Sequence, residues 1–188
     1  EVLRVALDAA AERARLAQGE DSAPPAPYQR DPAARPADRP GAPFWQLVEF
    51  RTAVEDAGAR AGLEAALEAA GLLDAWVGPD GAVDGGAAAS LFDTLLITRT
   101  AQPASLAAWL APAQRCALDP VMVERLLASV ACSLDDQGAE AWVAPDGRFR
   151  IGPLGGAWAK PAAEYIGAAS RAEARRRRIA EIDALLAA

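Results

Sequence analysis

A seven-residue motif occurs twice in this chain, at residues 75–81 and 141–147, and its two copies differ only in Gly78 versus Ala144. Each copy runs from an apolar stretch into Pro-Asp-Gly, a sequence typical of tight turns. Proline fixes φ at the first corner, aspartate accepts hydrogen bonds from the following backbone, and glycine adopts positive φ without strain. A second short apolar run follows each copy, at residues 82–83 and 149–151. The motif therefore predicts two β-hairpins, each with a tryptophan that anchors it to a core.

A helix pattern precedes each copy, so the repeating unit is larger than the motif. The first helix covers about residues 51–70, with Gly71 where a C-terminal cap belongs. The second begins at Asp119-Pro120, a capping residue followed by proline in the first turn. We expect residues 70–83 and 130–151 to be two copies of one helix-then-hairpin unit. The fold class that follows is α+β, with two related halves in one domain of residues 44–160.

Three further stretches of this domain have local signals. Residues 44–50 are mostly apolar and are expected to enter the core. Residues 94–98, Thr-Leu-Leu-Ile-Thr, are apolar or β-branched and predict a strand, and Gly85-Gly86 before them predicts a loop. Ser105 is placed to cap a short helix that runs through Leu110.

Both ends of the chain carry helix patterns with apolar residues at alternating spacings of three and four. Over residues 1–18 the predicted seam is Leu3, Leu7, Ala10, Ala14 and Ala17, and Gly19 is a plausible stop. Over residues 161–188, where Pro161 is placed to start the helix, the seam is Tyr165, Ala168, Ala172, Arg175, Ile179, Ile182 and Leu186. Helices that leave a domain and return to it at one point run antiparallel. We therefore expect an antiparallel coiled-coil pair with the domain at its tip.

Residues 19–43 change abruptly in composition. They are polar and charged, and they hold Pro24, Pro25, Pro27, Pro32, Pro36, Pro40 and Pro43. Proline at this density cannot continue a helix, and the segment has little apolar surface to bury. We expect a flexible or surface-hugging segment between the first helix and the domain. A Pro-rich recognition arm is the alternative interpretation.

The composition excludes several classes of active site. The chain has no histidine, which removes Ser-His and Cys-His nucleophile pairs and the common zinc sites, and it has neither phosphate-binding glycine motif. The glycines between Gly152 and Gly156 fit a turn or a close backbone approach better than an anion site. Cys116 and Cys132 are expected to be core thiols. We therefore predict no catalytic residue, cofactor or metal, and no apolar run approaches the ~20 residues that would span a membrane.

One concentration of basic residues stands out against a net charge of −7. It consists of Lys160, Arg171, Arg175, Arg176, Arg177 and Arg178. One interpretation is the solvated face of a coiled coil, with the Arg175 stem lying over the seam. The functional interpretation is weak contact with DNA phosphates near the junction of domain and helix.

Three stretches, taken together, resemble one known family. They are residues 62–77 (GLEAALEAAGLLDAWV), 146–154 (DGRFRIGPL) and 163–171 (AEYIGAASR). These resemble the middle of the large SMC-like ATPases of bacterial Wadjet plasmid-defence systems, relatives of MukB and MksB. The resemblance covers most of residues 44–175 and does not include the Pro-rich segment.

The resemblance implies a hinge that joins two copies of such an ATPase, with the ATP-binding heads outside this chain. It implies a cytoplasmic complex, associated with the nucleoid or with plasmids, that acts on DNA together with other subunits. The implied partners are therefore a second copy of this chain, DNA and those subunits, and no membrane.

The dimer interface is expected in the domain, because short alanine-rich helices associate weakly. The predicted residues are Phe149, Ile151, Gly152, Gly155, Gly156 and Trp158, where a hairpin edge meets glycines that let another backbone approach. This stretch would pair with itself or with residues 76–83 of the partner. Two competing functions stay open: a monomeric ligand-binding or enzymatic module inserted in a coiled coil, and a docking platform that uses the Pro-rich segment.

Overall fold

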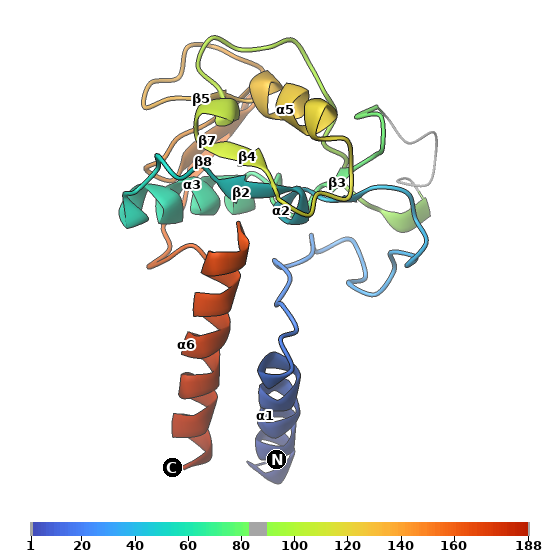
Figure 1. Cartoon of the computed structure of the whole chain (residues 1–188), viewed down its shortest axis with the longest axis vertical. Coiled ribbons are helices and arrows are strands. Elements are labelled where there is room, and N and C mark those ends of the chain that lie inside the picture. Colours follow the sequence, from blue (N-terminus) through green and yellow to red (C-terminus); the bar gives the residue numbers. More distant parts are fainter. Residues whose placement is uncertain (1, 83–89, 188) are drawn as a thin grey trace.

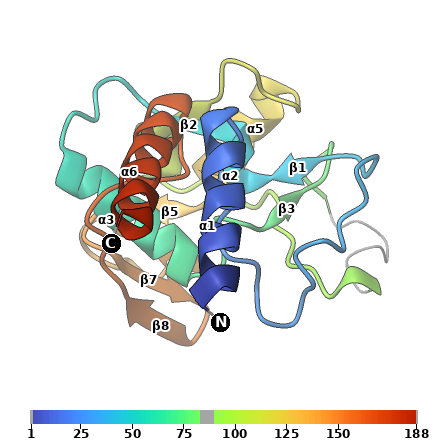
Figure 2. The same cartoon turned by 90° about the horizontal axis from the view of Figure 1, so that it is seen from below.

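Two helices stand side by side beneath a small α+β domain in the computed structural model of the chain, which describes residues 2–82 and 90–187 (Figure 1). They are α1, Val2–Ala17, and α6, Ala168–Leu186. The two chain ends lie together at the bottom, so the helices run antiparallel, and the view from below shows the same neighbourhood (Figure 2). In the described residues no helix has the length and apolar character needed to cross a membrane.

Ser90 and Leu91 are helical, and four further helical elements have described bounds within the domain; local chemistry sets the ends of the two longer ones. These elements are α2, Phe44–Leu47; α3, Ala57–Ala69; η1, Leu106–Ala108; and α5, Pro120–Ser129. Asp56 caps α3 by accepting hydrogen bonds from two backbone N–H groups, and Asp119 caps α5 by accepting one from Val121. Gly71 follows α3 at φ 72°, the left-handed conformation expected of a helix stop.

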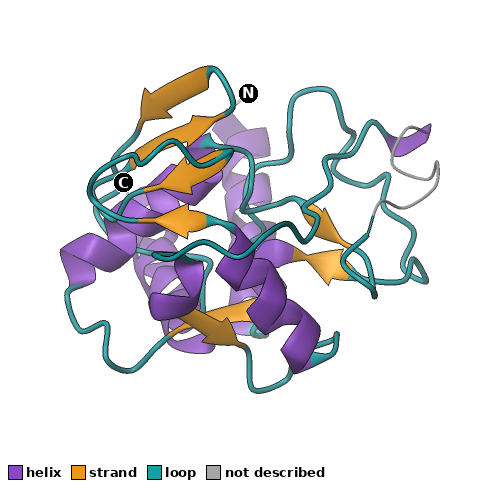
Figure 3. Ribbon diagram, turned by 90° about the horizontal axis from the view of Figure 1, so that it is seen from above, coloured by secondary structure: helices purple, strands orange, loops and turns teal. Residues whose placement is uncertain are grey.

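The strands form three small sheets. In the first, β1 (Ala42–Pro43) pairs antiparallel with β3 (Trp76–Val77), and in the second β2 (Val48–Phe50) pairs antiparallel with β4 (Leu110–Pro112). The third has the order β5-β6-β7-β8, with bounds Ala131–Cys132, Ala141–Val143, Arg148–Ile151 and Leu154–Ala157. Figure 3 shows its four strands in one row at one side of the domain. Residues 94–98, predicted to be a strand, form instead an isolated parallel bridge from Leu95 to Trp76 and a hydrogen bond from the Thr98 N–H to Gly81 O at 2.9 Å.

One apolar cluster joins the two halves of the domain. Leu63 and Leu67 of α3 and Leu126 and Leu127 of α5 are fully buried, together with Phe44 from the stretch expected to enter the core. At roughly 2 kcal/mol or more for each such side chain, this burial supplies most of the favourable free energy of folding. The halves therefore share one core.

The repeat is only partly reproduced in three dimensions. The second copy forms the predicted hairpin, β6–β7. The first copy forms the same turn, but its strand β3 pairs with β1, which precedes it in the chain. Val83, expected in the returning strand, and Gly85-Gly86 lie outside the described residues. The motif thus encodes a turn, while the strand partners come from elsewhere.

The seam predicted for α1 lies on the wrong face. Ala9 and Leu16 pack on Ile182, whereas Leu7 is 62% exposed and Ala10 and Ala14 face solvent. The Leu3 side chain is outside the described part. Polar residues select the face, because Glu12 pairs with Arg178 and Arg13 with Asp183 beside the apolar contacts. On α6, Ile179 and Ile182 face α1 as predicted, but Leu186 at the end of the helix is 43% exposed.

The final helix does not start at Pro161. Residues 161–167 are irregular and α6 begins at Ala168, after Gly167 at φ 84°. The physical reason is competition for backbone donors. The N–H groups of Glu164, Tyr165 and Ile166 donate to the Glu64 carboxylate of α3.

Candidate interaction edge and arm junction

Strand β8 is the open edge of the four-stranded sheet. All four of its residues are exposed, and among the described residues it pairs on one side only, with β7 (Figure 2). The opposite edge is covered, because the backbone N–H of Cys132 in β5 donates to Ala104 O at 3.0 Å and Ser105 forms an antiparallel bridge with Ala131. An unpaired edge strand presents free backbone donors and acceptors to another chain.

The pairing of β8 identifies which of its backbone groups point outward. The Trp158 N–H donates to Gly147 O at 3.0 Å, directly beyond the Arg148–Ala157 pair. Hydrogen-bonded and non-hydrogen-bonded pairs alternate in an antiparallel ladder, so Gly156 and Leu154 face β7. The N–H and C=O groups of Gly155 and Ala157 therefore point away from the sheet. These are the groups available to a second strand.

Apolar side chains accompany this edge. Leu154 is 67% exposed and Trp158 is 46% exposed, although both are large and apolar. Exposed apolar residues of this size beside an open strand are typical of an interaction surface. Phe149, a predicted interface residue, is instead buried under the hairpin, and Ile151 is half-buried.

The predicted glycines have separate local roles. Gly152, at φ 54°, forms the β7–β8 turn. A Cβ on Gly156 would lie 2.9 Å from the Phe149 ring, so this glycine makes room for a side chain of its own domain. A Cβ on Gly155 would lie 3.4 Å from Phe149 O, a contact that a small shift relieves. Gly155 is thus the position where a substitution tests the edge without disturbing the core.

The charges of the hairpin are neutralised within the chain. Arg148 pairs with Asp146, and Arg150 pairs with Asp136 in the loop before β6. The guanidinium of Arg150 lowers the pKa of Asp136 to about 2. A second copy approaching β8 would meet little net charge here.

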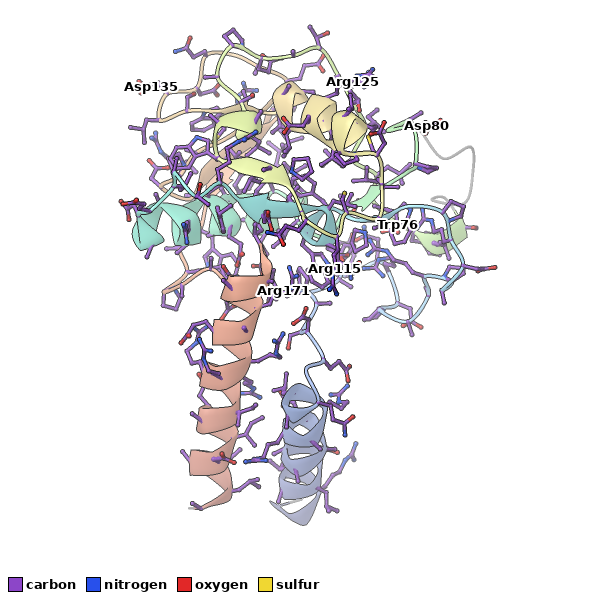
Figure 4. The ribbon with its side chains drawn as sticks, in the orientation of Figure 1. Trp76, Asp80, Arg115, Arg125, Asp135 and Arg171 are labelled. Atoms are coloured by element: carbon purple, nitrogen blue, oxygen red, sulfur yellow. The ribbon has the colours of Figure 1, made fainter. Side chains whose placement is uncertain are left out.

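The six basic residues predicted to contact DNA all have carboxylate partners. Arg171 and Arg175 pair with Asp21, Arg177 with Glu164, Arg176 with Glu173 and Arg178 with Glu12. Figure 4 places Arg171 at the domain end of α6. Arg176 is the most exposed, with 71% of its side chain accessible. DNA contact stays a prediction, and it would have to compete with these pairs.

Lys160 is held inside the molecule. Its side chain is 5% exposed, and its Nζ lies 2.9 Å from both Glu64 and Glu68 and 3.2 Å from Glu164. Burial opposes the charged form, yet Glu64 and Glu68 raise the pKa of Lys160 above its ordinary value. The ammonium ties the chain beyond β8 to α3.

A buried ion-pair network, absent from the sequence predictions, anchors the Pro-rich segment. We name residues 20–41 the strap. Arg30, Arg35 and Arg39 of the strap all contact Asp93, whose side chain is fully buried, and Arg30 and Arg35 also contact Asp74. These contacts favour the surface-hugging interpretation of the segment over a free arm.

The network also includes the first motif. Arg35 and Arg39 lie over the Trp76 ring, 5.1 and 4.5 Å from its centroid, and the Trp76 indole N–H donates to Pro40 O at 3.0 Å. Figure 4 shows Trp76 at the right flank of the domain. The sequence did contain a signal for the arginines of this network. Arg35 and Arg39 each precede a proline, and Arg30 lies five residues before Arg35.

No protein-family model and no curated protein matches the chain. Among solved structures, it is similar to the SMC hinge domain of Geobacillus stearothermophilus, described as an asymmetric dimer, with 15% identity, 98% of this chain and 86% of that chain covered, and a TM-score of 0.39. It is also similar to the Pyrococcus furiosus Smc hinge domain with an extended coiled coil, with 15% identity, coverage of 97% and 69%, and a TM-score of 0.39. Because identities of 15% and TM-scores of 0.39 are low, the proposals below rest on the residues and contacts of this chain.

Proposed function

We propose that this chain is a hinge-like dimerisation domain at the tip of a long antiparallel coiled coil. The observation that carries the proposal is the open edge of β8, with outward backbone groups at Gly155 and Ala157 and exposed Leu154 and Trp158 beside them. An edge of this kind pairs readily with a second strand. The occupant we propose is a second copy of this chain.

The arrangement of α1 and α6 supports the position at a tip. The helices leave the domain side by side and antiparallel, held by Glu12–Arg178, Arg13–Asp183 and the contact of Leu16 with Ile182 (Figure 1). A longer chain would continue as a two-helix arm from this base. The domain boundaries 1–18, 19–43, 44–160 and 161–188 belong to the proposal. Strand β1 begins at Ala42, two residues before the segment 44–160.

The cellular setting comes from the sequence resemblance. Residues 62–77, 146–154 and 163–171 resemble the middle of SMC-like ATPases of Wadjet systems. The proposed protein is therefore a DNA-translocating ATPase in plasmid restriction or chromosome organisation, cytoplasmic and associated with nucleoid or plasmid DNA. Its ATPase heads and its contacts with other subunits lie outside this chain.

A monomeric docking or ligand-binding module is the alternative, and one cavity favours it. A space of about 390 Å³ lies between the strap and the domain, lined by Arg30, Arg35, Trp45 and Trp76. However, Asp74 and Asp93 occupy most of the donors of Arg35. The arginines are thus committed to holding the strap, and the cavity has little left to bind a ligand.

The test is the molar mass of the chain in solution, measured by analytical ultracentrifugation across a concentration series. The wild type is expected to dimerise. Ala157→Pro removes an outward N–H, and Gly155→Glu places a charge on the edge. Each change occurs in both copies of the dimer and should weaken it at least tenfold, because two lost hydrogen bonds at about 1 kcal/mol each, or two carboxylates brought into the interface, exceed ~1.4 kcal/mol.

Gly58→Glu, at an exposed position in the first turn of α3, is the control with the same change in charge and size. It should leave the dimer intact. A wild type that is monomeric at high micromolar concentration refutes the proposal. A dimer that survives both edge changes refutes its placement on β8.

A further inference from the structure

Glu64 is a carboxylate with no exposed surface, and it joins two segments far apart in the chain. Its Oε1 accepts from Lys160 Nζ at 2.9 Å and from the Glu164 N–H at 2.6 Å. Its Oε2 accepts from the Tyr165 and Ile166 N–H groups at 3.0 and 2.9 Å. Neither the dimer edge nor the core explains a buried charge at this position of α3.

The bonding of Glu64 fixes the direction of the chain just before α6. Burying a carboxylate costs several kcal/mol unless its oxygens are fully bonded, and an apolar side chain of similar size would pack without this cost. Three successive backbone N–H groups turned toward one anion hold their segment in a single conformation. Gly167 and α6 follow at once, so Glu64 orients the base of the arm.

Lys160 connects the same carboxylate to the open edge. It lies two residues after Trp158 and three after the end of β8. Its ammonium also lies 4.2 Å from the centroid of the Tyr165 ring. The segment between β8 and α6 is therefore fastened at both of its ends to Glu64.

Helix α3 provides a rigid base for this arrangement. A Cβ on Gly62 would lie 2.0 Å from Pro145 O, so the helix backbone lies directly against the β6–β7 turn. Glu64 lies two residues further along α3 and is thus fixed relative to the strands β6, β7 and β8. Helices α1 and α6 are linked into one arm, because Asp21 and Glu12 on the α1 side form ion pairs with arginines of α6.

We propose that Glu64 is a positioning residue that couples the direction of the α6 arm to the β8 edge. Pairing of β8 with a second copy restrains the start of the segment 158–166, and the bonds of this segment to Glu64 carry the restraint to the arm. Coupling is reciprocal, so an arm held in one direction strengthens the dimer by the same factor. The dimer half of this inference rests on the proposed function, whereas the orientation of the arm by Glu64 does not.

The test measures arm direction and dimer affinity in the same variants. Spin labels at Val121 of α5 and Ala180 of α6, both exposed, report the distance between domain and arm by pulsed electron resonance. Cys116 is replaced by serine. Cys132 stays, because it is buried and its pKa is raised to about 12, so it does not react with the label. Labelled protein is diluted with unlabelled protein to remove distances between copies.

Two variants separate the two connections. Glu64→Gln turns an amide N–H₂ toward backbone donors, so we expect a broad distance distribution and a dimer weakened about fivefold or more. Lys160→Met keeps the three backbone bonds to Glu64. Its distance distribution should therefore stay narrower than that of Glu64→Gln, while the dimer weakens. Val77→Ala shortens a fully buried side chain of β3, away from both labels and from Glu64, and is the control for lost stability alone. It should change neither measurement.

Each outcome decides the inference. A Glu64→Gln distribution as narrow as that of the wild type overturns it. A broad distribution with unchanged dimer affinity overturns the coupling and leaves the hinge standing. A wild type that never dimerises refutes the proposed function and the coupling, while the distances still decide whether Glu64 orients the arm. If Glu64→Gln does not fold, Glu64→Asp, which shortens the side chain, takes its place with the same expected broadening.

Discussion

Replacing Asp93 with asparagine should release the strap from the domain. The Asp93 carboxylate accepts from Arg35 Nε and Nη2, each at 2.9 Å, and from Arg39 Nη1 at 2.7 Å, and Arg30 Nε lies 3.2 Å away. Asparagine is nearly isosteric but neutral. The change leaves three guanidinium groups, buried to 3–13% side-chain exposure, with Asp74 as the remaining carboxylate of the network.

The expected magnitude follows from this burial. Removing one partner of a buried ion pair costs about 3–5 kcal/mol, because the other charge stays desolvated. The strap has no helix or strand of its own, so it can leave the domain and return its arginines to water. At about 1.4 kcal/mol per factor of ten, a 3 kcal/mol loss raises the undocked fraction roughly 100-fold. The core beneath, built on α3 and α5, should stay folded.

Trypsin offers a selective assay for undocking. It cleaves after arginine but not before proline, so Arg35-Pro36 and Arg39-Pro40 are resistant and Arg30-Asp31 is the cleavable bond of the network. Arg30 is buried in the wild type, so its cleavage reports the undocked population when docking is fast. Mass spectrometry should detect peptides that end at Arg30 about 100-fold faster in Asp93→Asn. Asp38→Asn, the same change at an exposed strap position, should cleave like the wild type.

Equal cleavage in wild type and Asp93→Asn would show that the network does not hold the strap. Acid provides an independent check. Burial alone would raise the pKa of Asp93, but Arg35 and Arg39 outweigh it and lower the pKa below its ordinary value. The stabilisation is therefore complete above the unfolded pKa of about 4 and is lost as pH falls through the folded value. Hydrogen exchange in residues 30–39 should rise only below about pH 4.

Three further predictions concern close contacts of glycines and the arginines of α6. Gly62→Ala should lower the melting temperature by several degrees, because its Cβ would meet Pro145 O at 2.0 Å and overpacking costs about 1–3 kcal/mol; an unchanged melting curve would contradict the close contact of α3 with the turn. Gly156→Ala should destabilise the domain through the Phe149 ring more than Gly155→Ala does, and equal unfolding curves in urea would refute this distinction. Fluorescence anisotropy should detect DNA binding of micromolar affinity or weaker with a steep salt dependence, and Arg176→Glu/Arg177→Glu/Arg178→Glu should abolish it; binding unchanged by that replacement would mean that the arginines only solvate the helix.

Local signals predicted two helix ends correctly, because their causes are local, but the helix expected over 51–70 begins only at Ala57, and Ser105 makes no capping bond to η1, which ends before β4 begins at Leu110. Asp119-Pro120 starts α5 and Gly71 follows α3 as the sequence indicates. The error at Pro161 has a distant cause, since the carboxylate that takes the backbone donors of residues 164–166 lies about 100 residues earlier in the chain. Lys160 was grouped with the arginines for the same reason. Neighbouring charges in sequence gave no indication of Glu64 and Glu68, which hold it.

The strap was harder to predict, because its order depends on charge instead of apolar periodicity. A polar segment with many prolines normally stays disordered, since it buries too little apolar surface to offset its chain entropy. Here Arg30, Arg35 and Arg39 meet Asp74 and Asp93, two carboxylates that no pattern in the sequence distinguishes from the others. Pairing across a fold is specified only by the fold itself.

The two motif copies show how far a repeated sequence determines structure. In both, the aspartate accepts from the N–H two residues on, and the glycine has positive φ, 67° at Gly81 and 94° at Gly147. In both, the indole N–H of the tryptophan donates to a backbone carbonyl.

The strands beside the two tryptophans also correspond, although they come from different places in the chain. Each tryptophan has one parallel neighbour, Leu95 or Ala131, and one antiparallel neighbour, Pro43 or Arg150. The antiparallel neighbour precedes the motif in the first half and follows it in the second. The seven residues therefore specify a turn and an anchored tryptophan between two strands. The antiparallel strand comes from β1, directly after the strap, in the first half and from β7, across the β6–β7 hairpin, in the second.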